Sequence, residues 1–216
     1  MVAVAGVALW AGGWAWTLFV AAIASGVLWE WWRLVERITK SVLGRLVWLG
    51  GGILYVAGAA AVLWLLRNSP ALAERGWLAV LSILLPVIAT DIGAYFAGRT
   101  IGGPKIAPRI SPSKTWAGLV GGMMAAGAML AAINLVKGRG DDQTVVSFVL
   151  FSTLLGAVIA VVAQAGDFFE SWMKRRAGVK DSGNLIPGHG GLFDRVDGLL
   201  PVLLLVGLID WLAVVL

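Results

Sequence analysis

The chain has 216 residues, of which 59% are hydrophobic, well above the roughly 45–50% of soluble domains, so it is expected to be an integral membrane protein. It contains no cysteine and a single histidine, which excludes disulfides and thiolate chemistry and argues against a histidine-rich zinc site. The net charge of +5 lies in short loops between apolar runs, which fits topology signals and anionic headgroups better than nucleic acid.

Six apolar runs are long enough to cross a bilayer as helices, which takes about 20 residues each. They are unbroken rather than alternating, so the sequence predicts an all-α polytopic membrane protein and not a barrel. Six to seven transmembrane helices are expected, because the first run contains Gly12-Gly13 and forms either one tilted helix or two short ones. Trp29, Trp31 and Trp32 at its end predict an interfacial anchor. The runs are Val2–Leu28, Leu46–Leu66, Trp77–Ala97, Trp116–Val136, Thr144–Gly166 and Leu199–Leu216.

The basic residues of the five intervening loops number four, two, four, two and five, which accounts for all 17. Because Lys and Arg favour the cytoplasmic side, we expect loops one, three and five, and with them the active site, to face the cytoplasm. Residues 1–216 are expected to form a single integral membrane domain. Its parts are the N-terminal helices (1–90), a catalytic part (91–198) and the last transmembrane helix (199–216).

The third loop follows an ionisable residue inside an apolar run. Asp91 is costly there unless it is paired or faces water, and Tyr95 follows one helical turn later. Hydroxyl groups and one ammonium precede the next apolar run, an arrangement suited to holding a phosphate. They belong to Ser111, Ser113, Lys114 and Thr115. An ordinary loop with Ser/Thr capping and a lysine anchor is the alternative.

The fifth loop carries five acidic and five basic residues between Asp167 and Asp197, in a chain that is only 13% charged. Asp167, Glu170, Ser171 and Lys174 have the spacing of one helical face, if the preceding helix continues. Such a stripe suits hydrated Mg²⁺ beside a phosphate, since Mg²⁺ takes one or two carboxylates plus substrate phosphates. An exposed helix end with solvated charges is the alternative.

Glycines dominate the middle of the fifth loop, with four in the nine residues from Gly183 to Gly191. They allow backbone N–H groups to turn toward an anion, although a simple connector has the same composition. His189 is either functional or a hydrogen-bonded structural residue. Asp194 and Asp197 are expected to project from one face at the start of the last helix and to converge with Asp167 on a cation. The helix dipole alone also favours acids at that position.

Two blocks resemble the phosphatidate cytidylyltransferase (CDP-diacylglycerol synthase) family. The run from Ser171 to Asp197 has the Ser, Lys-Arg, Lys-Asp, His-Gly-Gly and Asp-Arg-x-Asp of that family at the expected spacing. The block from Asp91 to Gly118 is similar to its Asp-x-x-Ala-Tyr-x-x-Gly-Arg and Ser-Pro-x-Lys-Thr-Trp patterns, but Ala117 stands where the family usually has Glu. The resemblance covers about half of the chain, and one to three N-terminal helices of the family are expected to be missing.

The resemblance implies the reaction CTP + phosphatidate → CDP-diacylglycerol + pyrophosphate, in phospholipid biosynthesis at a bacterial inner (plasma) membrane. It implies Mg²⁺, alone or with a second cation, and a homodimer. CTP, phosphatidate and membrane lipids are the expected partners, and nucleic acid is not. The catalytic residues would be Lys174, Arg175, Lys180, Asp181, His189 and Arg195. The substrate-binding residues would be Ser111, Ser113, Lys114, Thr115, Asp91, Tyr95 and Ser171, and the metal ligands Asp167, Asp194 and Asp197.

Other functions fit parts of the sequence. A CTP-dependent transferase acting on another lipid, such as a polyprenol, shares the same chemistry. A CDP-alcohol phosphotransferase would need Asp-Gly-x-x-Ala-Arg, and Asp197-Gly198 is not followed by that pattern. A transporter or flippase would line a pathway with charges, whereas these charges cluster in two loops. An inactive homologue serving as a scaffold is the last alternative.

Overall fold

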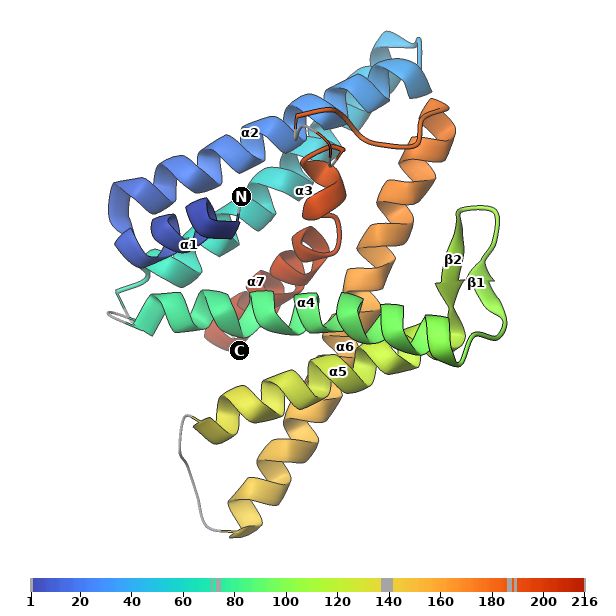
Figure 1. The fold of residues 1–216 in the computed structure, drawn as a ribbon. Coiled ribbons are helices and arrows are strands. Elements are labelled where there is room, and N and C mark those ends of the chain that lie inside the picture. Colours follow the sequence, from blue (N-terminus) through green and yellow to red (C-terminus); the bar gives the residue numbers. More distant parts are fainter. Residues whose placement is uncertain are drawn as a thin grey trace. The chain divides into compact units, whose positions relative to one another are not determined.

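The computed structural model describes residues 2–70, 72, 75–136, 142–185, 188 and 190–215. This part of the chain is mostly helical, with one short pair of strands (Figure 1). Its elements in chain order are α1 (Val2–Ala11), α2 (Gly13–Ile38), α3 (Val42–Asn68), α4 (Gly76–Thr100), β1 (Lys105–Ala107), β2 (Ser111–Thr115), α5 (Trp116–Val136), α6 (Asp142–Ala177), the 3-10 turn η2 (Phe193–Arg195) and α7 (Leu199–Val215).

Among the described residues, five helices are long and apolar enough to cross a bilayer: α2, α3, α4, α5 and α6. α7 is a shorter apolar helix. A helix satisfies its backbone hydrogen bonds within the segment, which is what the hydrocarbon region demands. The predicted all-α, multi-pass membrane architecture is confirmed.

The first apolar run forms two helices rather than one. The break between α1 and α2 falls at the glycine pair, where Gly12 has φ +63° and Gly13 has φ +48°. Residues other than glycine rarely adopt such backbone angles, so the glycine pair allows the helix to break and the chain to turn here. α2 then continues to Ile38, past the predicted end at Leu28, and the tryptophans from Trp29 to Trp32 are part of this helix.

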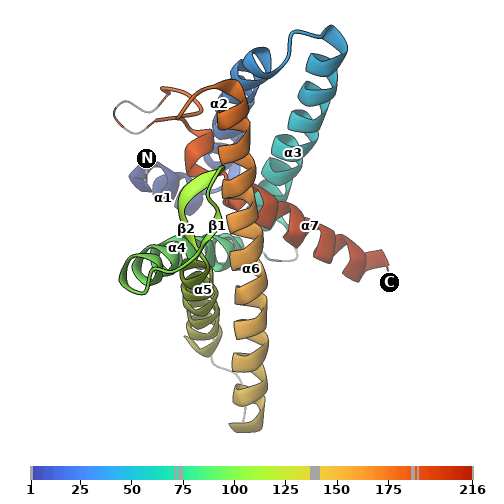
Figure 2. The ribbon, with the colours of Figure 1, turned by 90° about the vertical axis from the view of Figure 1, so that its right-hand side faces the viewer.

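α6 is also longer than predicted. It runs without a break to Ala177 instead of ending at Gly166 (Figure 2). Its last turn carries basic side chains, which interact favourably with the helix dipole. The Gly178 N–H then donates to Arg175 O at 3.2 Å, and the Val179 N–H donates to Lys174 O at 3.0 Å, a pair of bonds typical of a helix that ends at a glycine. The residues of the predicted polar stripe are therefore helical.

Two compact units divide the chain: Met1–Val80 with Phe169–Leu216, and Leu81–Phe168. In the first unit, α2 packs against α3 through Trp31, whose side chain is buried and whose Nε1 donates to Trp48 O at 2.9 Å. α3 and α7 approach closely at Gly207, where an added Cβ would lie 2.5 Å from Val62 Cγ2.

In the second unit, glycines let the helices approach closely. A Cβ at Gly121 of α5 would lie 2.3 Å from the Cβ of Ala97 on α4. A Cβ at Gly156 of α6 would lie 2.3 Å from the backbone N of Gly127 on α5. Small residues at such contacts are the usual means of packing helices in a bilayer, where apolar side chains gain little from leaving lipid.

The third loop of the chain, which belongs to the second unit, forms a hairpin. β1 pairs antiparallel with β2, with Lys105 opposite Thr115, and the two strands lie side by side (Figure 2). The sequence analysis expected a loop here. Both segments are short, and Pro112 lies within β2, where a proline disfavours a strand. The hairpin presents the hydroxyl-rich segment Ser111–Thr115 as an extended strand immediately before α5.

Candidate functional site

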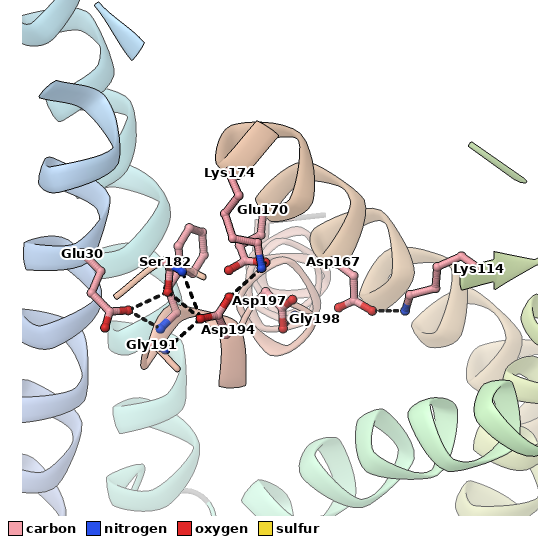
Figure 3. A network of polar contacts seen from close by, with 11 residues as sticks. Glu30, Lys114, Asp167, Glu170, Lys174, Ser182, Gly191, Asp194, Asp197 and Gly198 are labelled. Atoms are coloured by element: carbon pink, nitrogen blue, oxygen red, sulfur yellow. Dashed lines mark hydrogen bonds and ion pairs between the residues drawn. The ribbon is translucent and has the colours of Figure 1, made fainter. Parts of the chain in front are cut away.

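A group of polar side chains in the first unit surrounds the carboxylate of Asp194 (Figure 3). Asp194 lies in η2, and both of its oxygens have partners. Oδ1 accepts from Lys174 Nζ at 2.6 Å, while Oδ2 accepts from Ser182 N at 3.1 Å, Ser182 Oγ at 3.0 Å and Gly191 N at 2.8 Å. The fifth loop is therefore folded around this carboxylate.

The ammonium of Lys174 joins two acids. Its Nζ lies 2.6 Å from Asp194 Oδ1 and 2.6 Å from Oε2 of Glu170, one turn earlier on α6. The Glu170 side chain is only 1% exposed, and those of Lys174 and Asp194 are each 14% exposed. An ion pair this deeply placed loses much less to solvent screening than a surface pair.

The pKa of Asp194 reflects this setting. Burial alone would raise the pKa of this carboxyl. Hydrogen bonds from the Lys174 ammonium and the Gly191 N–H, together with the charge of Lys174, help to outweigh the burial and hold the pKa of Asp194 below its ordinary value. The group is therefore ionised throughout the physiological range.

The carboxylates of this group suit Mg²⁺, because they offer only oxygen atoms as ligands and Mg²⁺ prefers oxygen. Glu170 Oε1 is buried without a partner among the described residues, which leaves one oxygen for a ligand. Asp197 is partly buried in the turn that follows η2. Within the described part of the chain no three acidic or imidazole side chains converge on one point. A metal here would thus rely on one or two carboxylates together with water or substrate phosphates.

Glu30 is a member of this group that the sequence interpretation did not predict. It lies on α2, is fully buried, and accepts hydrogen bonds from Ser182, Leu192 and Phe193 of the fifth loop. An acid between three tryptophans in an apolar run is itself a sign of function. That sign could have singled out Glu30 from the sequence.

The other predicted residues of the fifth loop have different environments. Lys180, Asp181, Arg175 and Arg195 are exposed, and Ser171 on α6 is partly buried. His189 lies outside the described residues. Asp194 and Asp197 precede α7 in a 3-10 turn and the turn that follows it, rather than starting the helix, because α7 begins only at Leu199.

A second polar group lies in the unit formed by Leu81–Phe168. The ammonium of Lys114, on β2, forms an ion pair with Oδ2 of Asp167 on α6 (Figure 3). These side chains are 23% and 15% exposed. Asp91 lies on α4, in the same unit. The hairpin of the third loop and α6 therefore bring together two residues that are 53 positions apart.

The remaining residues of the third loop divide into buried and exposed groups. Thr115 is 2% exposed, and its Oγ1 accepts from Gly118 N at 3.0 Å, so it caps the N-terminus of α5. Such Ser/Thr capping was the alternative interpretation of this loop. Ser111 is partly buried and Ser113 exposed. Tyr95 is exposed on α4, and its hydroxyl accepts from Arg99 Nη1 at 2.9 Å.

Asp167 and Asp194 belong to different units. Their convergence on one cation stays a prediction.

The apolar helices and the partly buried acid–lysine group define a multi-pass membrane protein with a charged polar site in its first unit. Residues 49–212 match the cytidylyltransferase family, and the chain belongs to that family. It is similar to a phosphatidate cytidylyltransferase of Brucella suis, with 36% identity over 88% of this chain and 82% of the relative. A phosphatidate cytidylyltransferase of Pseudomonas aeruginosa is 38% identical over 85% of this chain and 67% of its own length. One of Rickettsia bellii is 34% identical, over 82% and 72% respectively. The resemblance drawn from the two sequence blocks is confirmed.

Proposed function

We propose that the chain is a phosphatidate cytidylyltransferase, which converts CTP and phosphatidate into CDP-diacylglycerol and pyrophosphate. The observation that carries this proposal is the Lys174–Asp194 pair, which lies in the loop that resembles the family signature. Relatives that carry this name match more than four-fifths of the chain. Residues 91–198 are proposed as its catalytic part.

In this reaction an oxygen of the lipid phosphate attacks the α-phosphorus of CTP, the bond to the β-phosphate breaks, and pyrophosphate leaves with the electron pair. Both reactants are anions, so the site must offset their charge before they can approach. We assign phosphate binding to Lys174, Arg175 and Lys180, since Arg offers a bidentate grip and Lys a point charge. A phosphate monoester is already ionised, so the reaction needs no strong general base.

We propose that Asp167, Asp194 and Asp197, with Asp181 assisting, hold divalent cations, Mg²⁺ among them. Each ion would take one or two of these carboxylates and complete its ligands with water or substrate phosphates. When bound, Mg²⁺ would offset phosphate charge and stabilise the leaving pyrophosphate. The oxygen-only donor set supports this assignment, as does Glu170 Oε1, which is buried without a partner among the described residues. A second cation beside it is part of the same proposal.

The third loop is proposed to bind substrate. Lys114 supplies a cation, Ser111 and Ser113 supply hydroxyl groups, and the partial exposure of Lys114 leaves its ammonium accessible to a phosphate that competes with Asp167. The remaining proposed contacts to CTP or lipid come from Asp91, Tyr95, Thr115, Ser171, His189 and Arg195.

We place both loops on the cytoplasmic side of a bacterial plasma membrane, where CTP is available. The uneven count of basic residues supports the sidedness. The bacterial relatives support the choice of membrane. A homodimer is expected from the family resemblance, and the mass of the detergent-solubilised protein tests it.

The test is incorporation of labelled CTP into lipid by the purified protein. Phosphatidate should be converted with Mg²⁺ present, and EDTA should stop the reaction. A panel that includes polyprenyl phosphate and other lipid phosphates separates this activity from that of a related transferase. Incorporation into another lipid but not into phosphatidate would contradict the proposed substrate, and no incorporation into any of them would contradict the reaction.

Asp194→Asn should abolish the product while the protein remains folded. The matched control is Asp210→Asn, which alters an exposed aspartate on α7 outside the site and should retain wild-type turnover. Full activity of the Asp194 variant would refute the role assigned to that carboxylate.

A further inference from the structure

Glu30 is a fully buried acid whose hydrogen-bond partners all come from one distant loop. Its Oε2 accepts from Ser182 Oγ at 2.9 Å (Figure 3). The same oxygen accepts from Phe193 N at 2.8 Å, and Oε1 accepts from Leu192 N at 3.0 Å. These donors are 152 to 163 residues away along the chain. No ion pair involves Glu30 within the described part of the chain, so these three donors compensate for the burial of its carboxyl group.

The fifth loop is shaped to receive this side chain. A Cβ at Gly183 would lie 2.3 Å from Glu30 Oε1, and a Cβ at Gly191 would lie 2.6 Å from Glu30 Oε2. One turn earlier on α2, a Cβ at Gly26 would lie 2.7 Å from Cδ2 of Leu192. At Gly183 and Gly191 the loop thus approaches the Glu30 side chain more closely than a residue with a Cβ would allow. At Gly26 the missing side chain of α2 leaves space for the Leu192 side chain.

An apolar contact holds the same turn. Trp31, next to Glu30, packs against Phe193 with their ring centroids 5.7 Å apart. The Phe193 side chain is fully buried. Phe193 directly precedes Asp194, and two residues of α2 hold it. Glu30 accepts a hydrogen bond from the backbone N–H of Phe193, and Trp31 packs against its ring.

Ser182 connects Glu30 with Asp194. Its Oγ lies 2.9 Å from Glu30 Oε2 and 3.0 Å from Asp194 Oδ2, and its backbone N–H donates to the same Asp194 oxygen at 3.1 Å. A hydroxyl has one proton and donates it to one acceptor at a time. Glu30 and Asp194 therefore share this hydroxyl, and a change at Glu30 alters the hydrogen bonding of Asp194.

We propose that Glu30 is a positioning residue for cytidylyl transfer. It holds the turn from Leu192 to Asp194 against α2 and, through Ser182, sets the orientation of the Asp194 carboxylate beside Lys174. This inference rests on the proposed function for its catalytic consequence. Its structural part, the hold of Glu30 on the turn, does not depend on that function.

The first test is hydrogen–deuterium exchange of the full-length protein in nanodiscs. In Glu30→Gln one arm of the carboxylate becomes an amide NH₂, which cannot accept from a backbone N–H. Exchange at Leu192 or Phe193, whichever amide faces the new NH₂ group, should rise by roughly tenfold or more, because that amide loses its acceptor. Glu36→Gln, a matched change on the same helix, should leave exchange at these two amides as in wild type. Unchanged exchange in Glu30→Gln would overturn the inference.

The second test is a kinetic cycle with Ser182→Ala. If Glu30 acts through Ser182 on Asp194, Glu30→Gln should lower kcat by roughly 10–100-fold with little change in the KM for CTP. The double variant should then be hardly slower than the slower single variant, because both changes break one connection. A residue needed only for stability would instead lower the amount of folded protein and leave kcat per folded molecule unchanged, which would also overturn the inference.

Ser182→Ala also covers the case in which Glu30→Gln does not fold, because it leaves both backbone bonds to Glu30 in place. It should lower kcat per folded molecule by itself, and a wild-type value would contradict the proposed connection. If the wild-type protein makes no lipid product, the proposed function fails. The exchange experiment still decides whether Glu30 holds the turn.

Discussion

Replacement of Lys174 by Met tests the central ion pairs of the site. The change keeps the apolar length of the side chain but removes the one ammonium that contacts both Glu170 Oε2 and Asp194 Oδ1, each at 2.6 Å. Removing one partner of a buried pair typically costs about 3–5 kcal/mol, because a buried charge is left without compensation. For a chain of this size that corresponds to a fall of roughly 6–20 °C in the melting temperature.

Thermal unfolding followed by tryptophan fluorescence in detergent would measure this effect. Lys180→Met is the matched control, since Lys180 is exposed in the same loop and its loss should change stability by no more than about 0.5 kcal/mol. Glu170→Gln added to Lys174→Met should recover part of the lost stability, because it removes one of the two acids left without a cation. If Lys174→Met melts with the wild type, or if the second change lowers stability further, the reasoning from these ion pairs is wrong.

Three further predictions concern Asp194, the hairpin of the third loop and the contact between α4 and α5. The folded-state pKa of Asp194 is lowered, so its carboxylate stabilises the fold fully above its ordinary pKa of about 3.9 and loses that effect as the pH falls below it. The melting temperature of wild type should therefore exceed that of Asp194→Asn at neutral pH and approach it below about pH 4, whereas a constant difference would contradict the pKa argument. Lys114→Ala should lower kcat/KM by roughly 10–100-fold, while Lys105→Ala, an exposed lysine of the same hairpin, keeps the wild-type rate; equal rates in the two variants would reduce the hairpin to a scaffold. Gly121→Val should destabilise the protein by about 1–3 kcal/mol, measured by thermal unfolding, since even a Cβ there lies 2.3 Å from Ala97 Cβ, and wild-type stability would refute the close α4–α5 contact.

The helices could be predicted from the sequence because a bilayer requires about 20 apolar residues per span, and that requirement is visible in composition alone. The ends of α2 and α6 could not. Both helices continue through charged and aromatic residues that resemble loop sequence, to Ile38 and Ala177. The end of α6 is determined locally, by the two hydrogen bonds that Gly178 and Val179 donate. A hydropathy pattern does not predict such bonds.

The composition of the site was predictable in part. The acids and lysines of the fifth loop have a distinctive spacing, so Lys174 and Asp194 could be named in advance, and the structure places them in contact. Glu30 could not be connected with them, because its partners lie more than 150 residues away and no short pattern links the two segments. The Lys114–Asp167 pair likewise depends on a tertiary contact between a hairpin and a helix.

The transfer itself is tested most directly by comparing CTP labelled at the α-phosphate with CTP labelled at the γ-phosphate. With wild-type protein, phosphatidate and Mg²⁺, the α-label should appear in the lipid and the γ-label in pyrophosphate, in equal amounts. Asp194→Asn should give neither product. Release of the γ-label as inorganic phosphate without α-label in lipid would show a nucleotide hydrolase and would contradict cytidylyl transfer by this chain.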